Sequence, residues 1–293
     1  MTQETPLQPF ITVIVITRNR AEVLSDCLSS ILEQDYTKDR YEVVVVDDGS
    51  TDHTSLVVNS LQTKAALPVI RYLPQPHRGT GAARNTGVKN ARGEIVIFLD
   101  DDELVTSDHM TRVVRPLMDD HNLDGVGGPC RDYGGSKLHT CARCSLAAVD
   151  VPGMGKRFVP RLLSGNMALR TSVFKRIGLF DETIFGRGED VEWFHRASGM
   201  QFFFDPDLWV WHRRDNFNFI TLCRYTFEQG LSIPLAMKKL GRSYRPKAIR
   251  VIGPLAHALR YRCVRGVVLA IRELGAISGY LDLSRLSRFN ISK

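Results

Sequence analysis

The 293-residue chain has no long hydrophobic run, no dense set of cysteines and no internal repeat. No stretch approaches the roughly 18 consecutive apolar residues that a membrane-spanning helix requires. The amino-terminal residues, MTQETPLQPF, lack the basic and then apolar order of a secretory signal peptide. Six cysteines spread over this length do not indicate a disulfide framework. We therefore expect a chain that stays in the cytosol.

The net positive charge of the chain is concentrated at its carboxyl end. Residues 242–293 contain 11 lysines and arginines against Glu273 and Asp282, whereas the whole chain has a net charge of only +7. The remainder is slightly acidic, so we expect no nucleic-acid partner for the body of the protein. Apolar residues recur at every fourth position from Leu255 to Ile271. Such a basic helix could bind an anionic membrane surface or dock on its own catalytic domain.

The fragment HTCARC offers His139, Cys141 and Cys144 as metal ligands, with Cys130 upstream. A structural zinc site usually needs a second clear ligand pair, and the sequence shows none. An ordinary loop is therefore the favoured interpretation.

Apolar runs that alternate with helical patterns predict an α/β fold built on an open, mostly parallel sheet. Four apolar runs, rich in β-branched residues, are typical of buried strands: residues 11–16, 43–46, 69–73 and 95–99. Helical spacing fills residues 21–34 and 55–62, and the segment RGTGAARNTGVKNA predicts a turn entering a third helix. Further helices are predicted within SVFKRIG and GEDVEWFHRAS, and two short strands within FFFDPDLWVWHRR.

Three polar clusters follow predicted strands: TRNR at residues 17–20, DDGS at 47–50 and DDD at 100–102. The carboxyl ends of parallel strands meet at one edge of the sheet, where such folds bind ligands. Adjacent carboxylates repel one another, so a cation is expected beside Asp100 and Asp102. Their oxygens suit Mg²⁺ or Mn²⁺ and leave coordination positions for a diphosphate. For DDD alone, a solvated acidic turn is the alternative explanation.

Taken together, these motifs resemble glycosyltransferase family 2, whose members have the GT-A fold. The matching segments, within residues 11–212, are ITVIVITRNR, VVVVDDGSTD, RGTGAARNTGVKNARGEIVIFLDDDE, SGNMALRTSVFKRIGLFDE and GRGEDVEWFHR. The resemblance implies metal-dependent transfer of a sugar from a nucleoside diphosphate to an acceptor hydroxyl, with inversion at the anomeric carbon. A UDP-sugar is the favoured donor, with Mn²⁺ or Mg²⁺ as cofactor.

The resemblance also implies roles for particular residues. Thr17 and Asp48 would hold the nucleobase, Asp101 would touch the ribose, and Arg78 would contact base or phosphate. The full donor-binding set is Thr17, Arg18, Asn19, Asp48, Gly49, Arg78, Asp100, Asp101 and Asn166. Asp102 would hold the metal, with Asp100 directly or through water. His212 falls where some members place another metal ligand, although a lone histidine is more often structural.

Asp190, in the segment GED, matches the family's catalytic base. An acceptor hydroxyl is a poor nucleophile, so a carboxylate must take its proton during attack. Glu189 would shape the site beside it, and both Glu189 and Trp193 would contact the acceptor. From the residues alone, the acidic pair could equally be first-turn acids of a helix. Core packing is the stronger default for a tryptophan.

We expect a nucleotide-sugar-binding half at residues 1–102, an acceptor-binding and catalytic half at 103–218, and a helical basic segment at 219–293. The resemblance implies a glycan, lipid-linked or cell-envelope acceptor in bacterial polysaccharide biosynthesis, reached in the cytoplasm or at the inner face of the membrane. A nucleotidyltransferase is one alternative, but TRNRAEV after the first strand lacks its Gly-rich loop. A non-catalytic binding module is another, although it would not need Asp190.

Overall fold

The computed structural model describes residues 8–64, 66–133, 155–184, 188–213 and 233–241, with scattered positions between 223 and 278. An eight-stranded sheet has the order β3-β2-β1-β4-β9-β6-β10-β8, and a three-stranded sheet has the order β5-β11-β7. The strands are β1 (Ile11–Thr17), β2 (Tyr41–Asp47), β3 (Val69–Pro74), β4 (Ile95–Asp100), β5 (Glu103–Leu104), β6 (Gly125–Gly127), β7 (Cys130–Tyr133), β8 (Arg157–Val159), β9 (Asn166–Arg170), β10 (Phe202–Phe204) and β11 (Val210–Arg213). The α-helices are α1 (Ala21–Leu32), α2 (Thr54–Lys64), α3 (Thr80–Asn90), α4 (His109–Asp119), α5 (Ser172–Ile177), α6 (Glu189–Arg196) and α8 (Ile233–Lys239); a 3₁₀ turn, η1, spans Lys38–Arg40.

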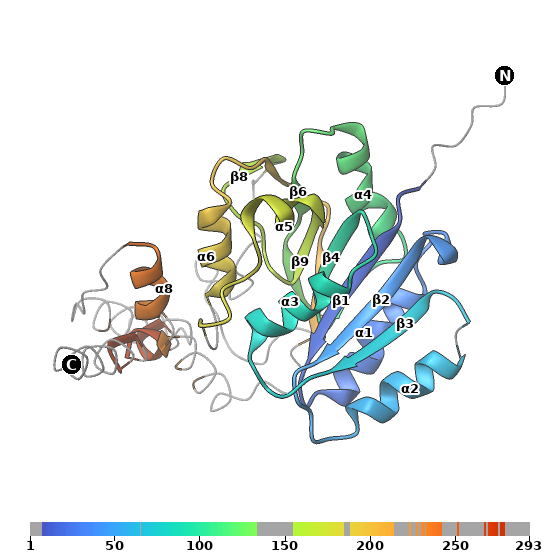
Figure 1. The fold of residues 1–293 in the computed structure, drawn as a ribbon, viewed down its shortest axis with the longest axis horizontal. Coiled ribbons are helices and arrows are strands. Elements are labelled where there is room, and N and C mark those ends of the chain that lie inside the picture. Colours follow the sequence, from blue (N-terminus) through green and yellow to red (C-terminus); the bar gives the residue numbers. More distant parts are fainter. Residues whose placement is uncertain are drawn as a thin grey trace.

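The predicted α/β architecture is confirmed. Strands β3, β2, β1 and β4 run parallel, β9 runs antiparallel to β4 and β6, and β10 is again parallel to β6. The four predicted amino-terminal strands and the helices between them all form within a few residues of their expected bounds. Figure 1 shows helices covering both faces of the large sheet.

Each face of the sheet packs against its own set of helices because successive strand residues point to opposite sides. Val13 and Val15 of β1 pack with Leu24 and Leu28 of α1, in a cluster that also includes α4. Ile14, between them, packs on the other side with residues of α5 and α6, such as Phe174 of α5. Burial on both faces explains why β1 and β2 are apolar without a two-residue alternation.

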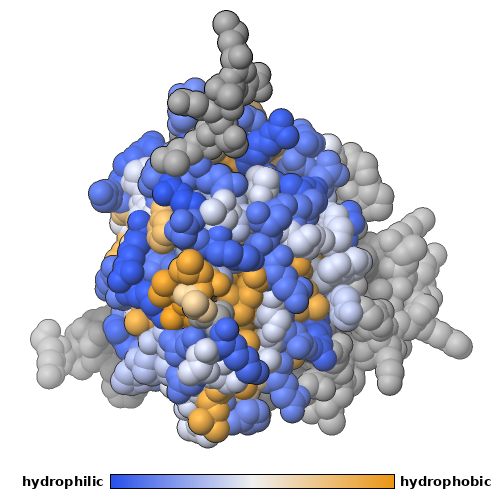
Figure 2. Space-filling model, turned by 90° about the vertical axis from the view of Figure 1, so that its right-hand side faces the viewer, coloured by the Kyte–Doolittle hydropathy of each residue, from blue (hydrophilic) through white to orange (hydrophobic). Residues whose placement is uncertain are grey.

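The face in Figure 2 carries an apolar patch near the edge strand β3. Large exposed hydrophobic residues of α2, β3 and the connection between them are Leu56, Leu67 and Val69. Leu67 and Val69 lie at the amino-terminal end of β3, away from the strand's carboxyl end. No helix among the described residues is long and apolar enough to cross a membrane.

Candidate active site

The candidate site lies where strands β1, β2 and β4 end. In the strand register, Thr17 pairs with Asp47, and Ile16 pairs with Asp100. The polar clusters TRNR, DDGS and DDD therefore start from one edge of the sheet, as the sequence pattern predicts.

Two buried aspartates form the centre of the acid cluster. Asp101 and Asp102 are each only 4% exposed. The Thr17 hydroxyl donates to Asp101 Oδ2 at 2.8 Å. Arg20 bridges the pair: its Nη1 donates to Asp101 Oδ1 at 2.8 Å and its Nη2 to Asp102 Oδ2 at 2.5 Å. Burial, which Arg20 only partly offsets, raises the pKa of Asp101 to about 7.

Arg20 supplies part of the positive charge that is expected beside three adjacent aspartates. Burial lowers its pKa, but the charges of Asp101 and Asp102 outweigh this effect, so the pKa of Arg20 lies above its ordinary value. Arg20 was not among the predicted site residues. Its place in the TRNR turn, at the same sheet edge as DDD, was the available signal.

The small sheet brings His212 to the acid cluster. Strand β11 pairs with β5 so that His212 lies opposite Glu103. His212 Nε2 is 3.4 Å from Asp102 Oδ2. Among the described residues, no group of three or more His, Cys, Asp and Glu side chains is arranged as a metal site. A carboxylate beside an imidazole fits a cation such as Mn²⁺ that takes further ligands from phosphate and water.

The buried Glu103 links Asp100 to Cys130. Glu103 Oε2 accepts the Asp100 backbone N–H at 3.0 Å, and Glu103 Oε1 accepts the Cys130 S–H at 3.0 Å. Burial is the main cause that raises the pKa of Glu103 well above its ordinary value. A Cβ on Gly165 would lie 2.6 Å from Glu103 Oε1 and 2.8 Å from Asp100 Oδ2, so a larger residue there would displace these carboxylates. Neither Glu103 nor Cys130 was among the predicted site residues.

Asp48 organises the connection between β3 and α3. Its Oδ1 accepts from Gln75 Nε2 at 2.7 Å and from the Arg78 backbone N–H at 2.9 Å. Its Oδ2 contacts His77 Nδ1 at 2.7 Å and accepts the Gly79 backbone N–H at 2.9 Å. A nucleobase N–H that binds Asp48 would therefore share its carboxylate with hydrogen-bond donors of the protein itself.

The three loops at the sheet edge are tied together by side chains. Arg18 Nη1 lies 3.1 Å from His77 Nε2. Arginine only donates, so His77 Nε2 must accept and Nδ1 carries the proton given to Asp48. Asn19, at φ 53°, receives the Thr51 backbone N–H on its Oδ1 at 2.7 Å. Gly49, at φ +82°, lies so close to His77 that a Cβ would meet the His77 backbone nitrogen at 2.9 Å.

Helix α6 carries the predicted base. Asp190 is partly exposed in its first turn, next to the buried Glu189. Glu189 forms an ion pair with the buried Arg84 of α3. Burial lowers the pKa of Arg84, but the charges of Glu189, Asp100 and Asp190 raise it above its ordinary value. Arg84, which was not among the predicted site residues, therefore interacts electrostatically with both the acid cluster and the predicted base.

Three predicted contacts need correction. Trp193 has no exposed surface and donates its Nε1–H to Gly178 O at 2.9 Å, so it packs the core instead of facing an acceptor. Glu189 is 3% exposed and is held by Arg84. Asn166 is also fully buried; its Nδ2 donates to Leu208 O at 2.7 Å, which makes it a structural link instead of a donor contact.

Arg78 remains accessible at the rim. Its side chain is 55% exposed and forms an ion pair with Glu182. A donor phosphate would compete with Glu182 for this guanidinium. The carboxylate partner of Arg78 could not be inferred from the local sequence, because 104 positions separate the two residues.

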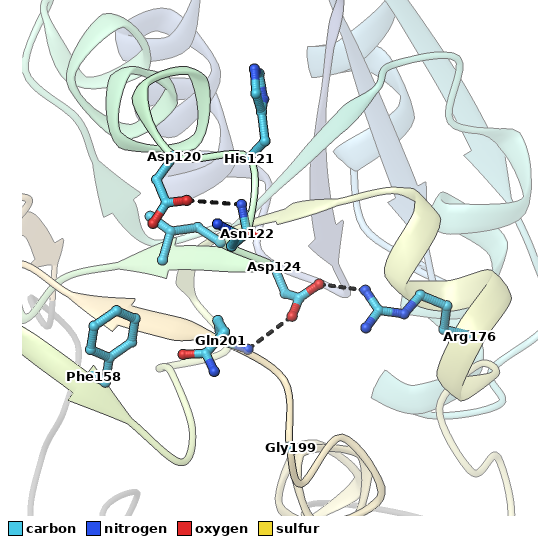
Figure 3. Close-up of a pocket in the computed structure, with 9 residues that line it drawn as sticks. Asp120, His121, Asn122, Asp124, Phe158, Arg176, Gly199 and Gln201 are labelled. Atoms are coloured by element: carbon cyan, nitrogen blue, oxygen red, sulfur yellow. Dashed lines mark hydrogen bonds and ion pairs between the residues drawn. The ribbon is translucent and has the colours of Figure 1, made fainter.

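A polar cavity of about 610 Å³ lies at the other end of the parallel strands from the candidate site (Figure 3). It is bordered by the residues that precede β6 and β10, two strands that run parallel to each other. Asp124 there accepts from Arg176 Nη1 at 2.6 Å and from the Gln201 backbone N–H at 2.8 Å. Since β6 has the same direction as β4, this cavity is distinct from the acid cluster at the carboxyl end of β4.

A family model described as "Glycosyl transferase family 2" matches residues 12–177, which is more than half of the chain. The chain belongs to this family. The match includes the TRNR, DDGS and DDD clusters and the preceding Gly-rich segment, so the resemblance read from the motifs is confirmed.

Relatives of this family member include the glycosyltransferase AglE of Haloferax volcanii, 31% identical over 193 residues that cover 65% of this chain and 62% of AglE. TarS of Staphylococcus aureus, a poly(ribitol-phosphate) β-N-acetylglucosaminyltransferase, is 36% identical over 113 residues, covering 39% of this chain and 19% of TarS. The chain thus spans less than two thirds of the length of these relatives.

Solved structures share the GT-A fold of this family member. The mannosyltransferase PcManGT of Pyrobaculum calidifontis, in complex with GDP-Man and Mn²⁺, has a TM-score of 0.60 at 20% identity and covers 98% of this chain and 82% of its own. Residues 1–349 of TarS, in complex with UDP, have a TM-score of 0.57 at 18% identity, with 90% of both chains covered. At this identity the likeness establishes the fold alone.

Two expectations fall outside the described residues. His139, Cys141 and Cys144 lie in the undescribed segment 134–154. Most of the basic tail, residues 242–293, is also undescribed. The described helix α8 precedes that tail, and its Lys239 Nζ lies 2.9 Å from Asp181 Oδ2, in the connection between α5 and α6.

Proposed function

We propose that this protein is a metal-dependent, inverting glycosyltransferase that moves a sugar from a nucleoside diphosphate sugar to an acceptor hydroxyl. Family membership supports a nucleotide-sugar glycosyltransferase. The observation that carries the finer proposal is the position of Arg84. Its buried guanidinium pairs with Glu189, the neighbour of Asp190 on α6, and the charges of Asp100 and Asp190 both raise its pKa. A donor site and a candidate base therefore lie around one buried cation.

We place the donor along the edge formed by residues 1–102, and the acceptor and base in residues 103–218. Thr17 ends β1 and is followed by Arg18 and Asn19, and Asp48 and Gly49 follow the end of β2. The exposed Arg78 supplies a guanidinium for phosphate. Among the neighbours in fold, TarS is bound to UDP and PcManGT to GDP-Man. We favour a UDP-sugar and test both nucleotides.

We propose that Asp102 and His212 hold Mn²⁺ or Mg²⁺, with Asp100 beside them. The donor types and the 3.4 Å separation of His212 Nε2 from Asp102 Oδ2 support this assignment. Such a cation supplies Lewis-acid stabilisation to the departing diphosphate. PcManGT is described in complex with Mn²⁺.

Asp190 takes the proton of the acceptor hydroxyl in this proposal. It lies in the first turn of α6, next to Glu189. Partial exposure leaves the side chain open to an incoming acceptor. Inversion requires a single displacement, hence one base and no covalent intermediate; inverting hydrolysis has the same logic.

For the acceptor we propose a glycan, a lipid-linked sugar or a cell-envelope polymer. TarS, by its name, acts on poly(ribitol-phosphate). We further propose that residues 242–293, with their excess of positive charge, bring the protein to an anionic membrane surface where such acceptors are held.

The proposal is tested by incubating the protein with a panel of UDP- and GDP-sugars and measuring nucleoside diphosphate release with and without Mn²⁺. Asp190→Asn should lower turnover by about 10²- to 10⁴-fold, the usual contribution of a general base, while donor affinity is retained. Asp102→Ala should abolish the stimulation by Mn²⁺. Unaltered turnover in Asp190→Asn would refute the base. In a parallel incubation with a nucleoside triphosphate and a sugar 1-phosphate, release of pyrophosphate would identify a nucleotidyltransferase.

A further inference from the structure

The side chain of Arg20 occupies the face of the acid cluster that a metal would need. Its two terminal nitrogens bind different carboxylates, Asp101 at 2.8 Å and Asp102 at 2.5 Å. The Asp102 oxygen that it contacts, Oδ2, is the same oxygen that lies 3.4 Å from His212 Nε2. The Arg20 side chain is 38% exposed, whereas those of both aspartates are almost fully buried.

The charge of Arg20 weakens the attraction of this acid cluster for a dication. A guanidinium is charged at every pH of interest, so it repels an approaching divalent cation throughout the working range. It also uses the lone pairs of Asp102 Oδ2 that a metal would coordinate. A nucleoside diphosphate changes this balance, because its phosphates bring negative charge to both cations.

We propose that Arg20 is the counter-ion that keeps a divalent cation out of the acid cluster until a nucleoside diphosphate is present. The inference rests on the proposed function, in which Asp102 holds the metal. It makes metal and nucleotide binding strongly cooperative, and by thermodynamic linkage each ligand raises the affinity for the other by the same factor. The metal then binds together with the donor, and at other times Arg20 offsets part of the negative charge of the acids.

The test measures Mn²⁺ binding by the EPR signal of the free ion, in the absence and presence of UDP or GDP. Arg20→Met should bind Mn²⁺ alone roughly tenfold tighter or more, because one repelling charge and one competing donor are removed. The factor by which nucleotide raises Mn²⁺ affinity should shrink by about the same amount. Arg20→Gln removes the same charge and should behave alike, whereas Arg20→Lys should stay close to the wild type.

Arg92→Met is the matched control. It removes one positive charge from a 65% exposed side chain that precedes β4, at the other end of that strand from the acid cluster. Its Mn²⁺ affinity should equal that of the wild type. Thermal unfolding of every variant checks that each is folded.

The inference would be overturned if Arg20→Met and Arg20→Gln bind Mn²⁺ as tightly as the wild type or more weakly. If the wild type still binds Mn²⁺ and nucleotide cooperatively in that case, the proposed function stands. If no protein in the set binds Mn²⁺ with either nucleotide, both the inference and the metal-dependent function are wrong.

Discussion

Replacing Arg84 with methionine removes the positive member of the buried pair that joins α3 to α6. The side chains of Arg84 and Glu189 are each 4% exposed, so the remaining carboxylate would be left without its cation and away from water. Breaking a buried ion pair from one side costs about 3–5 kcal/mol of the free energy of unfolding. A domain of this kind has only about 5–15 kcal/mol in total, so Arg84→Met should be severely destabilised.

The double variant Arg84→Met/Glu189→Met separates the loss of a pair from the loss of one partner. Apolar side chains of similar length need no hydrogen bonds, and replacement of a whole buried pair is often close to neutral. We expect the double variant to recover about 2 kcal/mol or more relative to Arg84→Met. Glu189→Met is the fourth corner of the cycle.

Equilibrium unfolding in urea, with the m-values compared, measures all four free energies. Arg115→Met is the control, because Arg115 and Asp119 are 81% and 70% exposed and such a pair contributes at most about 1 kcal/mol. Two outcomes would refute the view that this pair anchors α6. One is a loss of less than about 1 kcal/mol of unfolding free energy in Arg84→Met. The other is a double variant whose loss of unfolding free energy equals the sum of the losses in the two single variants.

Two further predictions concern acid stability and the membrane. Burial lowers the pKa of His109 from 6.5 to about 4, so the unfolded chain binds the proton first and stability falls as the pH drops from 6.5 to 4. Urea unfolding across this range should show that His109→Gln removes about 3 kcal/mol of that fall, and an unchanged pH profile would contradict the assignment. The basic tail, residues 242–293, should make the protein sediment with anionic vesicles at low salt and release it at high salt. Failure to bind at low salt would leave the tail without a membrane role.

The strands, helices and position of the site edge were predictable because they depend on local pattern. Buried parallel strands need apolar residues on both faces, which ITVIVI and VVVV supply. The place where each strand stops is marked by polar residues, and parallel pairing then brings Thr17, Asp47 and Asp100 to one edge. Motif order was enough to recognise the family.

The partners of the site residues could not be read in this way. Arg20 meets Asp101 across 81 positions, and Arg84 meets Glu189 across 105. Trp193 was predicted to contact the acceptor near Asp190, but its side chain lies in the core. Periodicity shows which residues share a face of one element, but not which element lies opposite. Pairing of distant charges depends on how helices pack on the sheet, and that packing exists only in the folded chain.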